Sequence, residues 1–172
     1  YYGGDNYINL TCNGSIIYED YTTSPYFYFS PLESYGRYVI GIESYSNQAL
    51  STRLTAKAVI NYYPDSNDID PPNVLIRADG LTWNNTIPAG EVKLTLVVLE
   101  DSGVDKIYVS YSLDDGVTWN SVKARRVHDN VYEVSLGEIP PGKYISLKVF
   151  VKDIHGNSMR QVIIRGLYTT QP

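Results

Sequence analysis

Downstream of its proline-rich centre, the chain alternates hydrophobic and polar residues with a period of two, which is typical of strands that bury one face. The clearest runs are residues 92–98, 107–111, 132–136 and 145–151. Polar segments with glycine or proline separate these runs, and no window of useful length shows a helical period. The pattern predicts an all-β protein with an antiparallel sandwich of seven or eight strands.

Register within the sandwich follows from the same alternation. The side chains of Val92, Leu94, Leu96 and Val98 should all point into the core. A slip of one residue would turn all four to solvent, so this strand fixes the register of its neighbours.

The first 64 residues are also rich in strand-forming residues but are less regular. They hold 12 of the 17 tyrosines and only 8 charged residues. Residues 26–30, 37–42 and 50–63 predict strands. Because residues 65–72 are polar and end in two prolines, we expect tandem domains: a small, Tyr-rich and possibly incomplete β domain at 1–64, a linker at 65–72, and a β-sandwich at 73–172.

Charge and composition narrow the classes of partner. A net charge of −5 disfavours nucleic acid, whose phosphates attract a basic surface. No apolar run approaches the roughly 18 residues of a membrane helix, so membrane insertion is not expected. The lone Cys12 has no partner for a disulfide within the chain. These features are compatible with an extracellular or cell-surface protein.

Residues that commonly carry catalysis are present but not in a catalytic pattern. His128 and His155 fall in predicted turns, and no serine lies in a G-x-S-x-G motif. Glu100 and Asp101 are sequence neighbours, which does not place two carboxylates on either side of a sugar ring. The chain itself is therefore expected not to be an enzyme.

Residues 112–119 carry a recognisable local motif. Their sequence, SLDDGVTW, resembles the Asp-box pattern S-x-D-x-G-x-T-W of sialidase propellers. A propeller repeats the box on several blades, whereas this chain has a single copy, so sialidase chemistry does not follow. We expect a structural hairpin in which Asp114 binds turn amides, Gly116 has a positive φ and Trp119 packs over the turn.

The expected linker contains closely spaced oxygen ligands. Asp65, Asn67, Asp68 and Asp70 resemble the acidic linker through which cadherin repeats share calcium. Such hard ligands suit Ca²⁺, which makes calcium the candidate cofactor. The alternative is a solvated polar linker without metal. If a metal binds elsewhere, the next candidates are Asp101, Asp105 and Asp153.

A family resemblance covers more than half of the chain. The residues that carry it are 70–74, 101–104, 107–119, 140–144 and 149–157. They resemble immunoglobulin-like and fibronectin III-like modules of prokaryotic secreted and surface proteins. Together with residues 26–31 and 35–40, which resemble small β domains of secreted proteases, the chain is similar to the C-terminal extensions of archaeal subtilisin-like proteases.

This resemblance implies a function without catalysis. It predicts an extracellular accessory or interaction module of a larger secreted enzyme, a subtilisin-like serine protease in the first instance. The alternative is a structural spacer or adhesion repeat of a surface-layer or cell-surface protein. Expected partners are the other domains of the parent chain and a cell-envelope protein or carbohydrate.

Overall fold

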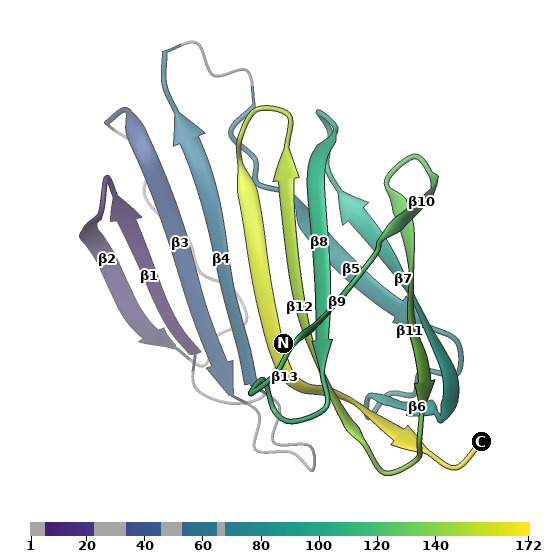
Figure 1. Ribbon diagram of the computed structural model, residues 1–172. Coiled ribbons are helices and arrows are strands. Elements are labelled where there is room, and N and C mark those ends of the chain that lie inside the picture. The colour runs from purple at the N-terminus through teal and green to yellow at the C-terminus, as the bar shows by residue number, and fades with distance from the viewer. Residues whose placement is uncertain (1–5, 23–33, 46–52, 65–67) are drawn as a thin grey trace.

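The computed structural model describes residues 6–22, 34–45, 53–64 and 68–172. These residues form thirteen strands in two sheets and no helix, which confirms the all-β prediction (Figure 1). All strand pairs are antiparallel except β6 with β13. No helix in the described ranges is long and apolar enough to cross a membrane.

The larger sheet has nine strands. In spatial order its main path is β2 (Ser15–Thr22), β1 (Asn6–Cys12), β3 (Gly36–Tyr45), β4 (Arg53–Tyr62), β13 (Ser158–Thr170), β12 (Tyr144–Asp153), β8 (Val104–Ser112) and β9 (Asn120–Val122), with β6 (Thr86–Pro88) pairing with the end of β13. The smaller sheet runs β10 (Arg125–His128), β11 (Val131–Ile139), β7 (Gly90–Leu99) and β5 (Asn73–Ala78).

The hydrophobic core lies between the smaller sheet and strands β8, β12 and β13 of the larger one. Val92, Leu94, Leu96 and Val98 of β7 are at most 3% exposed, which confirms the predicted register. They share this core with alternate residues of β12, namely Ile145, Leu147, Val149 and Val151. Residues 73–170 form nine strands rather than seven or eight, because the three-residue strands β6 and β9 give no alternating signal.

The N-terminal strands continue the larger sheet. Strand β4 pairs with β13 over seven residue pairs, from Val59 with Ser158 to Arg53 with Ile164. Residues 37–42 and 50–63 were expected to be strands, and β3 and β4 lie there; residues 26–30 lie outside the described residues.

The division into tandem domains stays a prediction, and β4 of the first segment shares a ladder with β13. The described part of residues 1–64 adds four strands, β1 to β4, to one edge of the sandwich. Pairing with β4 satisfies the backbone amide and carbonyl groups of β13 on the edge that faces away from β12. Of the expected linker, residues 68–72 lead into β5 of the smaller sheet, and residues 65–67 lie outside the described residues.

The hairpin of β1 and β2 begins the described chain. Asn13 and Gly14 connect the strands with φ values of 50° and 88°, the left-handed backbone that a two-residue hairpin turn requires. The Asn13 side chain accepts a hydrogen bond from the Arg37 backbone amide at 3.0 Å. This contact holds the turn against β3.

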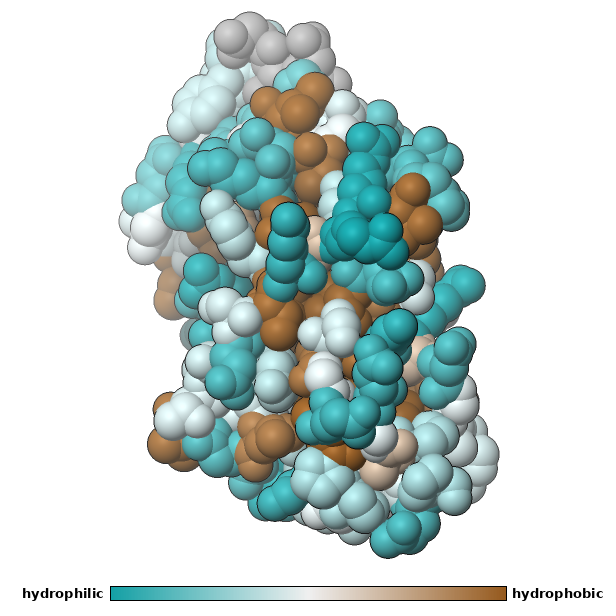
Figure 2. All heavy atoms as spheres, turned by 45° about the vertical axis from the view of Figure 1, so that its right-hand side comes forward, coloured by the Kyte–Doolittle hydropathy of each residue, from teal (hydrophilic) through white to brown (hydrophobic). Residues whose placement is uncertain are grey.

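The outer face of the smaller sheet is open to solvent. All four residues of β10 are exposed. Figure 2 brings forward the right-hand side of Figure 1, where β10 and β11 lie, and shows hydrophobic side chains in small patches between hydrophilic ones. One buried face and one mixed, hydrated face are typical of an antiparallel sheet.

Candidate metal site

Three carboxylates from segments far apart in the sequence meet at one end of the sandwich. Asp68 precedes β5, Glu100 follows β7 and Asp153 ends β12. One oxygen from each lies within 4.8 Å of the other two, and we call these three residues the carboxylate cluster. Oxygens bound to one Ca²⁺ at 2.3–2.6 Å are separated by at most about 5 Å, so the spacing suits a shared ion.

Asp153 is held by the tight turn that joins β12 to β13. Its Oδ1 accepts the backbone amides of His155 and Asn157, both at 2.9 Å. Gly156 has a φ of 87°, which lets the chain reverse here. Asp153 is completely buried, so its carboxylate is fixed before any ligand binds.

Asn157 connects the cluster to the neighbouring strands. Its Nδ2 donates to the backbone carbonyl of Asp68 at 2.9 Å and to Asp153 Oδ2 at 3.1 Å. Its Oδ1 accepts the backbone amide of Asn61, in β4, at 2.8 Å. Because Asn157 is fully buried, these bonds position Asp68 and β4 relative to the turn.

Ser102 bridges the other two carboxylates. Its hydroxyl oxygen lies 2.6 Å from Asp68 Oδ2 and 2.7 Å from Glu100 Oε1. One hydroxyl has one proton, so it donates to only one of the two carboxylates. The hydrogen bond from Ser102 holds the pKa of Asp68 below its usual value, assisted by the backbone amide of Asp70.

Glu100 has the one polar side-chain atom that is buried without a hydrogen-bond partner among the described residues. This atom is Oε2. Within the same part of the chain, no Lys or Arg forms an ion pair with Asp68, Glu100 or Asp153. Clustered carboxylates without a compensating charge cost free energy unless a cation or a proton neutralises them. The cluster therefore has the donor atoms and the unmet charge that a hard cation requires.

Of the four metal ligands predicted from the sequence, one lies in the carboxylate cluster. Asp68 lies in the cluster, whereas Asp65 and Asn67 lie outside the described residues. Asp70 contributes its backbone amide, which donates to Asp68 Oδ1 at 2.9 Å, but its carboxylate is not in the cluster.

Two further ligands come from distant turns. Of the reserve candidates, Asp153 joins the cluster and the other two, Asp101 and Asp105, do not. Glu100 was not expected as a ligand, because only the folded sheets bring the end of β7 next to Asp153. A surface hollow of about 370 Å³ borders Glu100 and is also lined by Asp70, Asp101 and Asn130, so solvent approaches the cluster from that side.

The two histidines are placed as expected for surface residues. His128 was predicted in a turn but is the last residue of β10, whereas His155 lies in the β12–β13 turn as predicted; both are exposed. His128 Nδ1 lies 3.9 Å from Asp129 Oδ2, at the limit of an ion pair between two highly exposed side chains.

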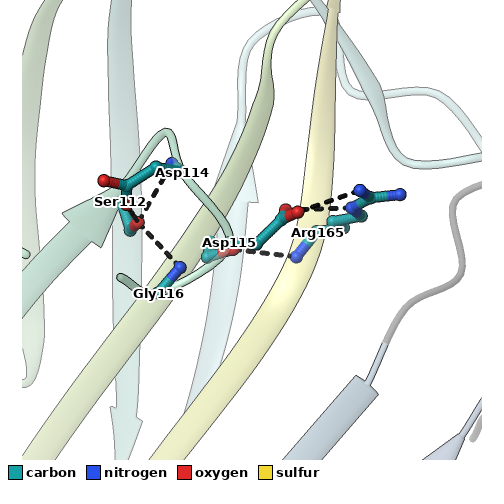
Figure 3. Close-up of polar contacts among 6 residues, drawn as sticks. Ser112, Asp114, Asp115, Gly116 and Arg165 are labelled. Atoms are coloured by element: carbon teal, nitrogen blue, oxygen red, sulfur yellow. Dashed lines mark hydrogen bonds and ion pairs between the residues drawn. The ribbon is translucent and has the colours of Figure 1, made fainter. Parts of the chain in front are cut away.

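The Asp-box segment forms the expected structural hairpin between β8 and β9. The Gly116 amide donates to Ser112 Oγ at 2.9 Å (Figure 3). Asp114 Oδ1 accepts the Thr118 amide at 2.8 Å. Gly116 has a φ of 87°, and a Cβ there would lie 3.2 Å from the Trp119 ring. Hydrogen bonds from Ser112 and Thr118 lower the pKa of Asp114 to about 2.

Comparisons with known proteins add no family. No protein-family model matches the chain. A search of curated proteins likewise gives no significant match to its sequence.

Proposed function

We propose that the chain is a non-catalytic, calcium-binding β-sandwich module of a larger secreted protein. The observation that carries this proposal is the buried, unpartnered Glu100 Oε2 inside a cluster of three carboxylates. Extracellular modules bind calcium with dissociation constants of about 10⁻⁴ to 10⁻³ M, a range suited to surroundings rich in the ion. The two packed antiparallel sheets support assignment to the immunoglobulin-like or fibronectin III-like class.

Calcium bound at the cluster would join three segments of the fold. Asp68, Glu100 and Asp153 each offer at least one oxygen, and backbone carbonyls or waters complete the coordination of such an ion. An ion that binds only the folded state stabilises it by about 2.7 kcal/mol when its concentration is a hundred times Kd. The module would thus be more stable outside the cell than in a calcium-poor compartment.

The experiment is a thermal melt with calcium or chelator, combined with calorimetric titration of calcium. In calcium, wild type should melt higher than in chelator, and Glu100→Gln should lose most of the increase. In chelator, Glu100→Gln should equal or exceed wild type, because it removes one of three mutually repelling charges. Equal wild-type midpoints in calcium and chelator would favour the polar-linker alternative.

Matched variants distinguish the loss of a cluster carboxylate from the loss of a negative charge elsewhere. Glu91→Gln removes the same charge from an exposed position of β7 and should titrate like wild type. Asp68→Asn should weaken calcium binding, whereas Asp70→Asn should not, because only the first carboxylate is in the cluster. An effect of Asp70→Asn as large as that of Asp68→Asn would place the ion along residues 65–70 instead.

For the parent protein we propose a subtilisin-like serine protease, in which this module is an accessory or interaction part. The support is the sequence resemblance of residues 70–167 and the all-β architecture. The alternative is a spacer or adhesion repeat of a surface-layer protein. The parent gene separates the two: a domain with a Ser-His-Asp triad upstream supports the protease, and further β repeats support the spacer.

A further inference from the structure

The outer face of the larger sheet, on the side opposite the core, carries a continuous row of basic and aromatic side chains. Residues directly opposite each other on antiparallel strands point to the same side of a sheet. Lys57 of β4 is opposite Arg160 of β13, which is opposite Phe150 of β12, which is opposite Tyr108 of β8. Four strands about 4.8 Å apart give this row a width of about 14 Å.

Two pairs of cations lie directly opposite each other on this face. Lys57 faces Arg160, and Lys106 of β8 faces Lys152 of β12. Like charges directly opposite each other destabilise a sheet. Within the described residues, none of these four cations forms an ion pair, and the nearest strands with acids on the same face are β3 with Glu43 and β2 with Glu19. A protein of net charge −5 thus concentrates unpaired positive charge here.

The two aromatic residues of the row stack on each other, and Tyr108 is the exposed one. The Tyr108 and Phe150 rings are stacked, with centroids 6.1 Å apart and an interplanar angle of 22°, and Tyr108 is 60% exposed. Arg160 Cζ lies 5.6 Å from the centre of the Phe150 ring. On the same face Lys148 places its ammonium 4.4 Å from the centre of the Trp119 ring. A contact with an aromatic ring attracts a cation without neutralising it, so Arg160 and Lys148 remain positive charges on this face.

We propose that this row binds a carboxylate-bearing polysaccharide. The row crosses four neighbouring strands, which gives an extended polymer several contacts along its length. Exposed aromatic rings offer apolar surface to the faces of sugar rings, while the opposed cations offer partners for carboxylates. An anionic ligand would also relieve the repulsion between Lys57 and Arg160, so the unfavourable arrangement of the free protein becomes favourable in the complex.

The test is affinity electrophoresis in chelator, so that it is independent of the calcium site. Polygalacturonate should retard the wild-type chain, and its uncharged methyl ester should not. The double variant Lys57→Gln/Arg160→Gln should bind about tenfold more weakly, and binding by wild type should fall as salt rises. Tyr108→Ser should also weaken binding, because it removes the most exposed ring of the row.

A matched control keeps the test specific. Lys93→Gln/Arg125→Gln removes the same charge from exposed positions of the smaller sheet and should bind like wild type. The Lys57→Gln/Arg160→Gln variant should melt no lower than wild type, which separates loss of binding from loss of folding. Equal weakening by both double variants, equal binding of the methyl ester, or equally tight binding of single-stranded DNA would each overturn the proposal.

Discussion

Asp115 and Arg165 form a bidentate ion pair although both hold their backbones in the left-handed region. Arg165 Nε lies 2.9 Å from Asp115 Oδ1, and Nη2 lies 2.9 Å from Oδ2 (Figure 3). Their φ values are 58° and 55°, and residues other than glycine adopt such positive values at an energetic cost. The pair joins the Asp-box hairpin to a bulge in β13 and lowers the pKa of Asp115.

We expect Asp115→Asn to lower the free energy of unfolding by about 0.5–1 kcal/mol, since the pair is partly exposed. Asparagine tolerates positive φ well, so this change removes the charge and preserves the turn. Chemical denaturation of Asp115→Asn, Arg165→Gln and the double variant measures the coupling. Effects of the single changes that simply add would show that the ion pair contributes nothing.

Acid should weaken the Asp-box hairpin through Asp114. Its pKa is about 2 in the folded chain, against 3.8 for an ordinary aspartate. A depressed folded pKa contributes stability that is present above about pH 4 and is lost as the pH falls towards 2. Asp114→Asn should therefore show less loss of stability than wild type across that interval. An NMR titration that gives Asp114 an ordinary pKa would contradict the expectation.

Two leucines of β7 test the register directly. Leu96 is fully buried, and Leu99 is 49% exposed at the end of the same strand. Leu96→Ala should cost about 2–5 kcal/mol in unfolding free energy, because it leaves a cavity in the core. Leu99→Ala should change it by less than about 0.5 kcal/mol. Similar costs at the two positions would mean that the strand is not packed as described.

Continuity of the larger sheet predicts a single cooperative unit. Calorimetry of the whole chain should show one unfolding transition, because β4 and β13 form a common ladder. A fragment of residues 68–172 should melt lower and associate, since it exposes the edge of β13. Two separate transitions, with the fragment as stable as the whole chain, would support independent tandem domains.

The alternating runs were sufficient to predict the sandwich. In β7 and β12 every second residue is buried, so local pattern and tertiary structure agree. The pairing of β4 with β13 has no such signal, because backbone ladders between distant strands do not depend on particular side chains. Strands β1 and β2 were not among the predicted strands, although the Asn13-Gly14 dipeptide between them carries a local hairpin signal.

The candidate metal site was predicted only in part. Asp68 was expected because its neighbours in the sequence are also acidic. Glu100 and Asp153 are 53 positions apart; Glu100 follows β7 and Asp153 ends β12, and neither strand sequence indicates a shared location. Their proximity depends on how the two sheets pack face to face, which sequence spacing does not encode. The opposed cations of the outer face were not predicted either, because Lys57 and Arg160 meet only through the pairing of β4 with β13.

The ladder between β4 and β13 has a consequence for biosynthesis. Val59 leaves the ribosome 99 positions before its partner Ser158. During that interval the β4 edge has no permanent partner, and an unpaired edge is where nascent chains associate. Contacts between such distant residues also slow folding. Among the described strands, β13 is synthesised last and pairs with the open edge of β4, so this edge remains vulnerable to aggregation until β13 emerges.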